Sequence, residues 1–312
     1  MSQSLYSDYS SYIRKLFGER VQKISLNTGY GCPNRDGTRG YGGCTYCNIH
    51  TFSPDYCKPQ KSVSQQLSEG IQFFSARYQS QKYLAYFQSY TNTYASFDLL
   101  KQTYEEALTH PGVVGLVVGT RPDCISDEIA AMFSDLATRC YVSVELGVES
   151  TINRTLELVN RCHTFEETQD AYALLKNRGM DLGAHIIIGL PGENEEDMLR
   201  HADTLSALPI QTLKIHQLQI VKHTRMAMQY EQEPSMFRLF DLEAYIDFMA
   251  RFTARLRSDI VIERFSSESP DRLLIAPKWN GIKNFEISHR VKKKMMEKGL
   301  YQGCDFRNSK EG

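Results

Sequence analysis

The residues of this sequence with the clearest chemical potential are three cysteines near its amino-terminal end. Cys32 opens a glycine-rich segment that closes with Cys44-Thr45-Tyr46-Cys47, so only two residues separate the last two thiols. Neighbouring ligands of one metal centre are commonly spaced in this way. Five glycines between residues 31 and 43 make the loop pliable enough to bring the thiolates together. Three such ligands leave one coordination position open.

Two kinds of metal centre suit this pattern. A structural zinc ion would need a fourth ligand, and His50 could supply it. An iron–sulfur cluster in which one iron has no protein ligand is the alternative. The remaining cysteines are scattered and form no second ligand set: Cys57, Cys124, Cys140, Cys162 and Cys304.

The composition is that of an ordinary globular protein. Of the 312 residues, 41% are hydrophobic and 23% charged, and 36 Lys and Arg nearly balance 37 Asp and Glu. A formal charge of -1 excludes a uniformly basic protein that coats nucleic acid, although local basic patches remain possible partners for RNA. The sequence contains neither a signal peptide nor an apolar run of about 18 residues, so we expect a cytoplasmic protein without a membrane partner.

The order of predicted elements indicates an α/β fold. Apolar segments rich in β-branched residues alternate with segments of helical periodicity. The predicted strands are 23–28, 83–88, 113–118, 141–146, 183–188 and 212–218. The predicted crossover helices are 63–78, 97–110, 127–138, 164–178 and 195–208. Six such units predict an open partial (β/α)6 barrel whose active face lies at the carboxyl ends of the strands.

The sequence changes character at about residue 224. Residues 225–240 are rich in Met, Phe and Gln, and a helix is predicted over 242–257. We therefore expect a core of residues 1–223, including an amino-terminal lead-in, and a C-terminal extension of residues 224–312 packed on the barrel. Because no low-complexity linker separates the two, independent motion of the extension is not expected.

The cysteine loop, with Tyr46 before its last cysteine, resembles the cluster loop of the radical S-adenosylmethionine (SAM) superfamily. The eleven residues between Cys32 and Cys44 exceed the commonest spacing there. Four segments at predicted strand ends add to the resemblance: Ser89-Tyr90-Thr91-Asn92-Thr93, Thr120-Arg121-Pro122-Asp123, residues 144–150 and residues 187–193. These segments are similar to the Elongator catalytic subunit and to oxygen-independent coproporphyrinogen oxidase. Taken whole, the chain most closely resembles the bacterial YhcC-like family.

The resemblance implies a radical SAM enzyme of the α/β partial-barrel type. Cys32, Cys44 and Cys47 would hold a [4Fe-4S] cluster whose free iron binds the amino and carboxylate groups of SAM. Reductive cleavage of SAM would then yield a 5′-deoxyadenosyl radical that removes hydrogen from the substrate. The electron would come from a reductase or from a flavodoxin- or ferredoxin-type donor.

The resemblance also assigns residues to SAM. Thr91, Asn92 and Thr93 would form the turn at the methionine amino group, and Arg161 would pair with the carboxylate. The other implied cofactor contacts are Tyr46 in the loop, Glu149 and His185 at the ribose, and Ile188, Gln219, Ile220 and Val221 around the adenine. Structural alternatives remain for several of them: a solvated carboxylate for Glu149, a surface arginine for Arg161 and a core histidine for His185. Periodicity alone would place Ile188 and residues 219–221 in a core.

Four further residues are candidates for substrate contact at the barrel mouth: Arg121, Asp123, Lys214 and His216. A buried polar network that supports the barrel is the alternative for all four. Three basic runs, residues 14–23, 251–257 and 290–294, could contact RNA phosphates or could be solvated helix faces.

The resemblance to Elongator suggests that the substrate is a wobble uridine of tRNA, altered at its side chain. Without a counterpart of the Elongator acetyltransferase portion in this sequence, trimming or rearranging an existing side chain is the simpler expectation. Radical oxidation or rearrangement of a small metabolite is one alternative. A non-catalytic iron–sulfur or zinc protein is another.

Overall fold

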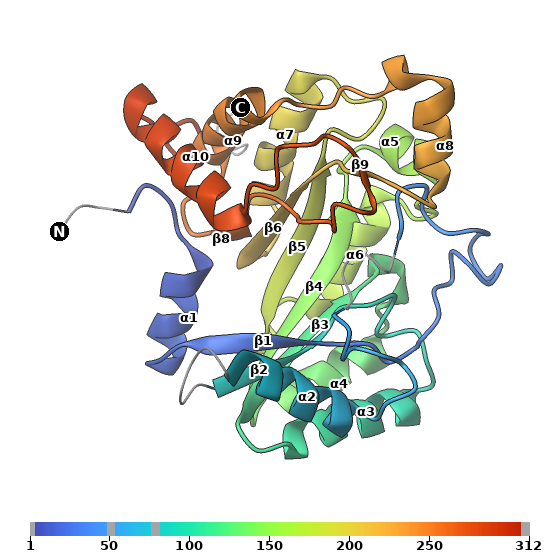
Figure 1. Ribbon diagram of the computed structural model, residues 1–312. Helices are drawn as coiled ribbons and strands as arrows, with labels where there is room; N and C mark the ends of the chain where they lie inside the picture. Colours follow the sequence, from blue (N-terminus) through green and yellow to red (C-terminus); the bar gives the residue numbers. More distant parts are fainter. Residues whose placement is uncertain (1–3, 49–53, 76–81, 307–312) are drawn as a thin grey trace.

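The computed structural model describes residues 4–48, 54–75 and 82–306 (Figure 1). Its centre is a parallel sheet of seven strands in the order β1-β2-β3-β4-β5-β6-β8, curled into a half-barrel. The strands are β1 (Val21–Leu26), β2 (Lys82–Phe87), β3 (Val113–Thr120), β4 (Tyr141–Glu149), β5 (Asp181–Ile188), β6 (Thr212–Gln217) and β8 (Val261–Arg264). The predicted α/β open partial barrel is confirmed, with one strand more than expected.

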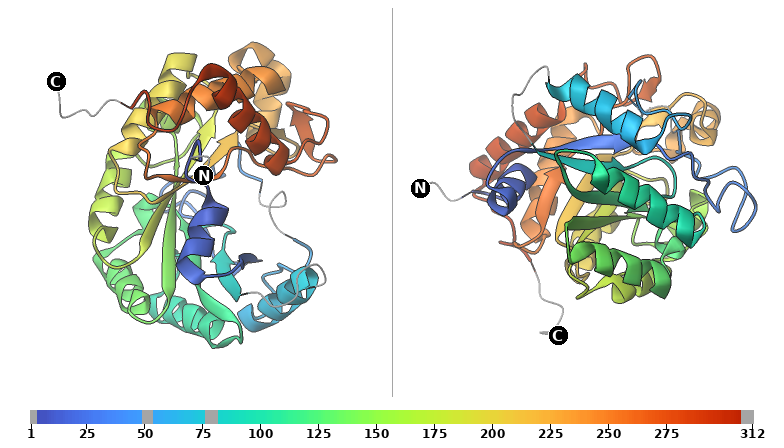
Figure 2. Two further views of the ribbon diagram at one scale, coloured as in Figure 1. Left: turned by 90° about the vertical axis from the view of Figure 1, so that its left-hand side faces the viewer. Right: turned by 90° about the horizontal axis from the view of Figure 1, so that it is seen from below.

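Helices cover the outer side of the curled sheet, as Figure 2 shows. The five predicted crossover helices are present as α2 (Val63–Ser75), α3 (Phe97–Thr109), α4 (Asp127–Ala137), α6 (Phe165–Leu175) and α7 (Glu195–Ser206). Side-chain caps define where several begin: Ser126 accepts from the Ile129 amide, and Thr164 forms a capping box with Glu167. Within the described ranges, none of the helices is long and apolar enough to cross a membrane.

The two faces of the sheet have different surroundings. Alternate strand residues such as Phe87 and Val118 point outward and pack against apolar side chains of α2 and α3, including Leu67. Leu84 and Val117 point to the inside of the half-barrel, where they form a smaller apolar cluster. The main core therefore lies between sheet and helices, which leaves the interior available for polar groups.

The seventh strand comes from the C-terminal extension. β8 pairs in parallel with β6, with Val261 opposite Thr212. Sequence periodicity missed it because four residues are too short for a clear pattern. The helix α1 (Tyr9–Phe17) was also not predicted; it contacts β1 and β8, and the Ile262 amide donates to the Ser7 carbonyl at 2.8 Å.

The rest of the extension adds helices and a small second sheet. The helices are α8 (Arg225–Gln232), α9 (Leu242–Arg255) and α10 (Asn284–Lys298), while the short α5 (Asn153–Leu158) belongs to the core. β7 (Ile220–Val221) pairs antiparallel with β9 (Leu274–Ala276). The expected extension is thus present, and its strand β8 forms one edge of the half-barrel sheet. The proposed boundary at residue 223 stays a prediction.

Replacing Gly115 of β3 by alanine should destabilise the sheet. A Cβ atom at this position would lie 2.2 Å from the carbonyl oxygen of Tyr141 on β4, so the paired backbones would have to separate. We expect a loss of about 2 kcal/mol or more in the free energy of unfolding, measured by urea denaturation. Gly119→Ala on the same strand is the matched control, because its Cβ would meet the Phe87 carbonyl oxygen at 3.3 Å. Equal losses in both variants would contradict the prediction.

Candidate active site

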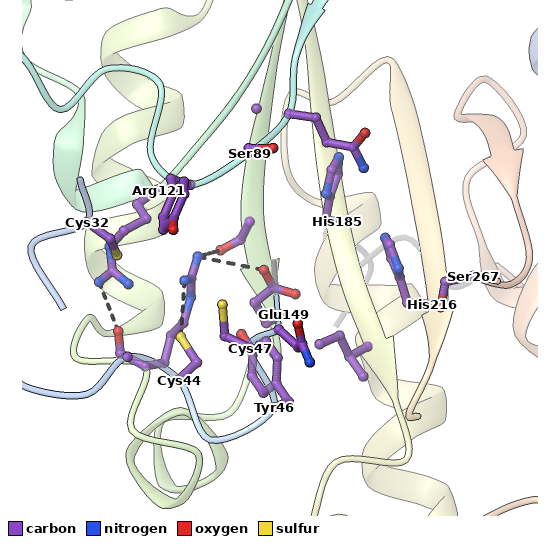
Figure 3. Close-up of a pocket in the computed structure, with 18 of the residues that line it drawn as sticks. Cys32, Cys44, Tyr46, Cys47, Ser89, Arg121, Glu149, His185, His216 and Ser267 are labelled. Carbon is purple, nitrogen blue, oxygen red and sulfur yellow. Dashed lines mark hydrogen bonds and ion pairs between the residues drawn. The ribbon is translucent and has the colours of Figure 1, made fainter. Parts of the chain in front are cut away.

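The three cysteines of the loop lie on one wall of a pocket at the carboxyl ends of the strands (Figure 3). His216 on β6 and Ser267, which follows β8, lie on the opposite side. Twelve of the predicted site residues line this pocket: Cys32, Cys44, Tyr46, Cys47, Thr91, Arg121, Glu149, Arg161, His185, His216, Gln219 and Val221. The tertiary structure thus brings together residues that are spread over most of the sequence.

Positively charged donors contact two of the three thiols. Arg35 Nη2 lies 3.3 Å from the Sγ atom of Cys47, and Arg161 Nη1 lies 3.5 Å from the Sγ atom of Cys44. Burial raises the pKa of the Cys47 thiol, and the hydrogen bond from Arg35 opposes that shift. Because iron binds thiolates, cationic donors at the sulfur atoms favour the form that a cluster needs.

Arg161 connects the cysteine loop to the end of β4. Its Nη2 atom donates to the Gly147 carbonyl at 2.7 Å and lies 3.7 Å from Oε1 of Glu149. The pairing of β4 with β5 is irregular between Gly147 and Glu149, and Glu149 has a positive φ of 65°. This irregular strand end places the Glu149 side chain at the pocket. The Nε atom of Arg161 is buried and has no hydrogen-bond partner in the described residues.

Arg121 and Asp123 form a pair in which only the arginine reaches the pocket wall. Nε and Nη2 of Arg121 donate to the two carboxylate oxygens of Asp123 at 2.9 and 3.0 Å. Nη2 also donates to the Arg161 carbonyl at 2.9 Å, while Nη1 is buried without a partner in the described residues. Asp123 therefore orients Arg121, and an unsatisfied donor of Arg121 remains beside the pocket.

Lys214 lies inside the barrel, beneath the pocket wall. Its Nζ atom is 2.7 Å from Oε2 of Glu145 and 3.2 Å from Oε1 of Glu263, and it donates to the Tyr86 hydroxyl at 2.9 Å. Lys23 bridges the same carboxylates, at 2.9 Å from Glu145 and 2.6 Å from Glu263. The structure therefore places Lys214 in a buried ionic network, which is the alternative that the sequence left open.

Two histidines connect this network to the pocket. His185 Nε2 lies 2.8 Å from Oε2 of Glu145, and the rings of His185 and His216 are 5.6 Å apart. Burial lowers the pKa of His216 well below its ordinary value, and the nearby charge of Arg264 adds to this effect. Burial also lowers the pKa of His185. Both imidazoles are therefore neutral near neutral pH and can accept a hydrogen bond.

Four of the residues expected at SAM have side chains away from the pocket wall: Asn92, Thr93, Ile188 and Ile220. Asn92 is fully buried, and its Nδ2 atom donates to the carbonyls of Phe87 and Gly119 at 3.0 and 2.8 Å. It thus joins the ends of β2 and β3 and supports the turn whose Thr91 lines the pocket.

Several residues at the site escaped the sequence analysis, among them Arg35, Glu145, Arg264, Ser267 and Ser269. Glu145 could have been found from the sequence, because an acidic residue inside an apolar strand needs a buried partner. The sequence pattern gave no indication of Arg264 and the two serines, because the strand that positions them was not predicted. His50, the candidate fourth zinc ligand, lies outside the described residues.

The predicted basic runs are largely engaged within the chain. Lys23 belongs to the interior network, and on α9 Arg251 pairs with Glu195 while Arg255 pairs with Asp203. On α10, Lys293 and Lys294 lie near Glu297 of the same helix. Exposed cations next to the cysteine loop are instead Arg35, Lys222 and Arg225.

Comparison with protein families identifies the class of enzyme. The model described as the Radical SAM superfamily matches residues 26–205, and the Radical_SAM C-terminal domain matches residues 210–297. The chain therefore belongs to the radical SAM superfamily, whose members are enzymes that use a [4Fe-4S] cluster and SAM.

Particular relatives refine this placement. Protein YhcC of Escherichia coli (strain K12) is 33% identical over 89% of this chain and 88% of its own length. The tRNA uridine(34) acetyltransferase of Methanocaldococcus infernus is 28% identical over 61% of this chain and 35% of its own length. The solved structure of archaeal Methanocaldococcus infernus Elp3 with an N-terminal deletion has a TM-score of 0.67 at 20% identity, covering 90% of this chain and 64% of that chain. The predicted likeness to the YhcC-like and Elongator-type radical SAM proteins is confirmed.

The pocket suits the two cofactors of the superfamily. Its cysteines are free thiols with cationic donors at two sulfur atoms. Unpartnered donors of Arg121 and Arg161 beside them are suited to an anionic ligand such as a carboxylate. Among the described residues, no three His, Cys, Asp or Glu side chains surround a single metal-ion position; thiolates that hold a four-iron cluster bind separate irons. When bound, the cluster supplies the electron that cleaves SAM.

The hydrogen bond from Arg35 should raise the reduction potential of the cluster. Positive charge at a ligating sulfur stabilises the more negative, reduced cluster, so Arg35→Gln should lower the potential by tens of millivolts. A redox titration followed by electron paramagnetic resonance measures this shift. Arg39→Gln is the matched control, since Arg39 lies in the same loop but pairs with Asp123 and Glu167. An unchanged potential in Arg35→Gln would refute the assignment.

Glu145→Gln should destabilise the protein by about 3 kcal/mol, because it removes one of the two carboxylates that Lys23 and Lys214 share in the interior. Burial acts to raise the pKa of Glu145, but the charges of Lys214 and Lys23 hold this pKa well below its ordinary value of 4.5. A carboxylate with a lowered pKa stabilises the fold above its ordinary pKa and loses this effect as pH falls. The variant should therefore lose less stability than the wild type between neutral pH and pH values below 4.5.

Urea midpoints at both pH values measure this difference. Glu69→Gln is the control, since Glu69 forms a more exposed ion pair with Lys61 and its removal should barely change the midpoint. Equal acid sensitivity of Glu145→Gln and wild type would contradict the role of this carboxylate.

Proposed function

We propose that this radical SAM enzyme alters the side chain of the wobble uridine of tRNA, at a carbon atom of an existing substituent. The similarity to a tRNA uridine(34) acetyltransferase supports this substrate, because it covers 61% of the chain. Trimming or rearranging a substituent needs no acetyl donor.

The observation that carries the proposal is the division of the pocket into two chemically different walls. One wall has the cysteines together with Arg161 and Glu149 and suits SAM. The opposite side has His216 and Ser267. Besides Arg264, the pocket lining also contributes uncharged amides and hydroxyls: Gln88, Gln217, Gln219 and Ser269. Such groups can both donate and accept, as the edge of an unstacked base requires.

Roles follow for the residues of the first wall. Arg161, with its unpartnered Nε, would hold the carboxylate of SAM, and Glu149 would accept from a ribose hydroxyl. Arg121 would be held by Asp123 against the same region. A reductase or a flavodoxin- or ferredoxin-type protein would supply the electron. The exposed cations Arg35, Lys222 and Arg225 would contact RNA phosphates at the rim.

Cys44→Ala should change the modified nucleosides of tRNA in cells. We expect one wobble-uridine species to disappear and its precursor to accumulate, because a cluster ligand has been removed. Mass spectrometry of nucleosides from bulk tRNA measures both, with equal protein levels confirmed. Cys304→Ala is the matched control, since Cys304 lies at the far end of the extension and does not line the pocket.

The nucleoside profile distinguishes two outcomes. Loss of a single species in Cys44→Ala alone would identify the step that the enzyme performs. A profile identical to that of the wild type would overturn the tRNA proposal and favour a small metabolite as substrate.

A further inference from the structure

Arg264, at the end of β8, is a guanidinium at the pocket that has no acidic partner among the described residues. Its Nη2 atom lies 3.0 Å from Nε2 and 3.3 Å from Nδ1 of His216. Its Nε atom is buried and has no hydrogen-bond partner in the described part of the chain. Since His216 is neutral, this contact leaves the positive charge of Arg264 uncompensated.

A β-bulge explains why this arginine faces the pocket. Leu213 of β6 lies opposite Ile262, but the next residue, Lys214, lies opposite Arg264, so Glu263 is an extra residue in β8. In a regular strand, Glu263 and Arg264 would point to opposite faces of the sheet. Because of the bulge, both side chains lie on the inner side of the sheet. There, Glu263 pairs with Lys23 and Lys214.

The neighbouring charges are already balanced. Glu263 and Glu145 are neutralised by the two lysines of the interior network, and Glu149 lies near Arg161. Besides Arg264, the pocket lining includes Gln88, Ser267 and Ser269, which are uncharged. A half-buried arginine whose Nε donor is buried and unpartnered is suited to a carboxylate or a phosphate.

Arg264 also lies where the pocket meets the open edge of the half-barrel. It lines a second hollow together with Tyr56 and Gln72 from the β1 side and Pro270 and Arg272 from the extension. Gln88 is shared between this hollow and the pocket.

We propose that Arg264 binds an anionic oxygen group of the substrate, a carboxylate or a phosphate, on the pocket wall opposite the cysteines. The proposal rests on the proposed function, because it requires that the modified uridine carry an anionic group. This group is either on its side chain or is its own phosphate. His216 accepts from Arg264 and keeps the guanidinium oriented.

The test measures anion binding without tRNA. Thermal unfolding of the protein with its cluster reconstituted is followed in acetate, in inorganic phosphate and in chloride at equal ionic strength. We expect acetate or phosphate to raise the melting temperature of the wild type above its value in chloride. The anion that does so distinguishes a carboxylate from a phosphate. Arg264→Gln should weaken that binding by about tenfold or more, whereas Arg139→Gln, on the outer helical layer, should not.

Two results would overturn the proposal: no stabilisation beyond chloride by either anion, or an equal stabilisation of Arg264→Gln. If Arg264→Gln does not fold, labelling of Arg264 by phenylglyoxal in the wild type gives the answer, since a bound anion should protect it. Arg264→Lys should retain only part of the effect, because lysine lacks the planar donor pair.

The tRNA experiment then separates the two claims. If the precursor that accumulates in Cys44→Ala cells has a carboxylate on its side chain, this result supports binding of that carboxylate by Arg264. If phosphate is the anion that binds, the result supports binding of the nucleotide backbone by Arg264. An uncharged precursor combined with acetate-specific binding would overturn the link to this substrate. An unchanged tRNA profile would overturn the proposed function while the anion measurement still decides the role of Arg264.

Discussion

The half-barrel depends on a buried ionic network that joins strands which do not pair with one another. β1 and β8 are the two edges of the sheet, and Lys23 on β1 reaches Glu263 on β8 at 2.6 Å. Glu145 on β4 binds Lys23 and Lys214 from the middle of the sheet. Charges buried in this way cost desolvation free energy, so their value lies in specifying one arrangement of the strands.

This network also sets the chemical character of the pocket above it. Because Glu145 and Glu263 are balanced by lysines, they add no net negative charge beneath the pocket. Glu145 in turn contacts His185, so the interior network continues into the pocket wall. The interior network therefore both joins the edge strands of the sheet and contacts the pocket wall.

The extension is part of the site as well as of the fold. It supplies an edge strand, the guanidinium of Arg264 and the hydroxyls of Ser267 and Ser269. The cysteine loop is held from the core, through Asn160, whose Nδ2 donates to the Gly43 carbonyl at 2.9 Å, and through Arg161 at Cys44. It is also held from the extension, where the Met226 amide donates to the Thr45 carbonyl at 2.9 Å. Core and extension thus both contribute residues to the lining of one pocket, which explains why residues far apart in sequence share it.

The sequence by itself determined the α/β class, the five outer helices and the cysteine loop. These features are local: periodicity, caps and the Cys-x-x-Cys spacing act over a few residues. The strand ends that line the pocket were also predictable, since side chains that follow parallel strands meet at one edge of a sheet.

Only the tertiary structure decided which polar residues face the pocket and which support it. Lys214 and Asp123 were equally plausible as substrate contacts, yet their partners Glu145 and Arg121 hold them behind the wall. Arg264 reaches the pocket only because a single extra residue in β8 shifts its register against β6. Such outcomes depend on pairing between strands distant in sequence, and a change of one residue in register reverses the face to which a side chain points.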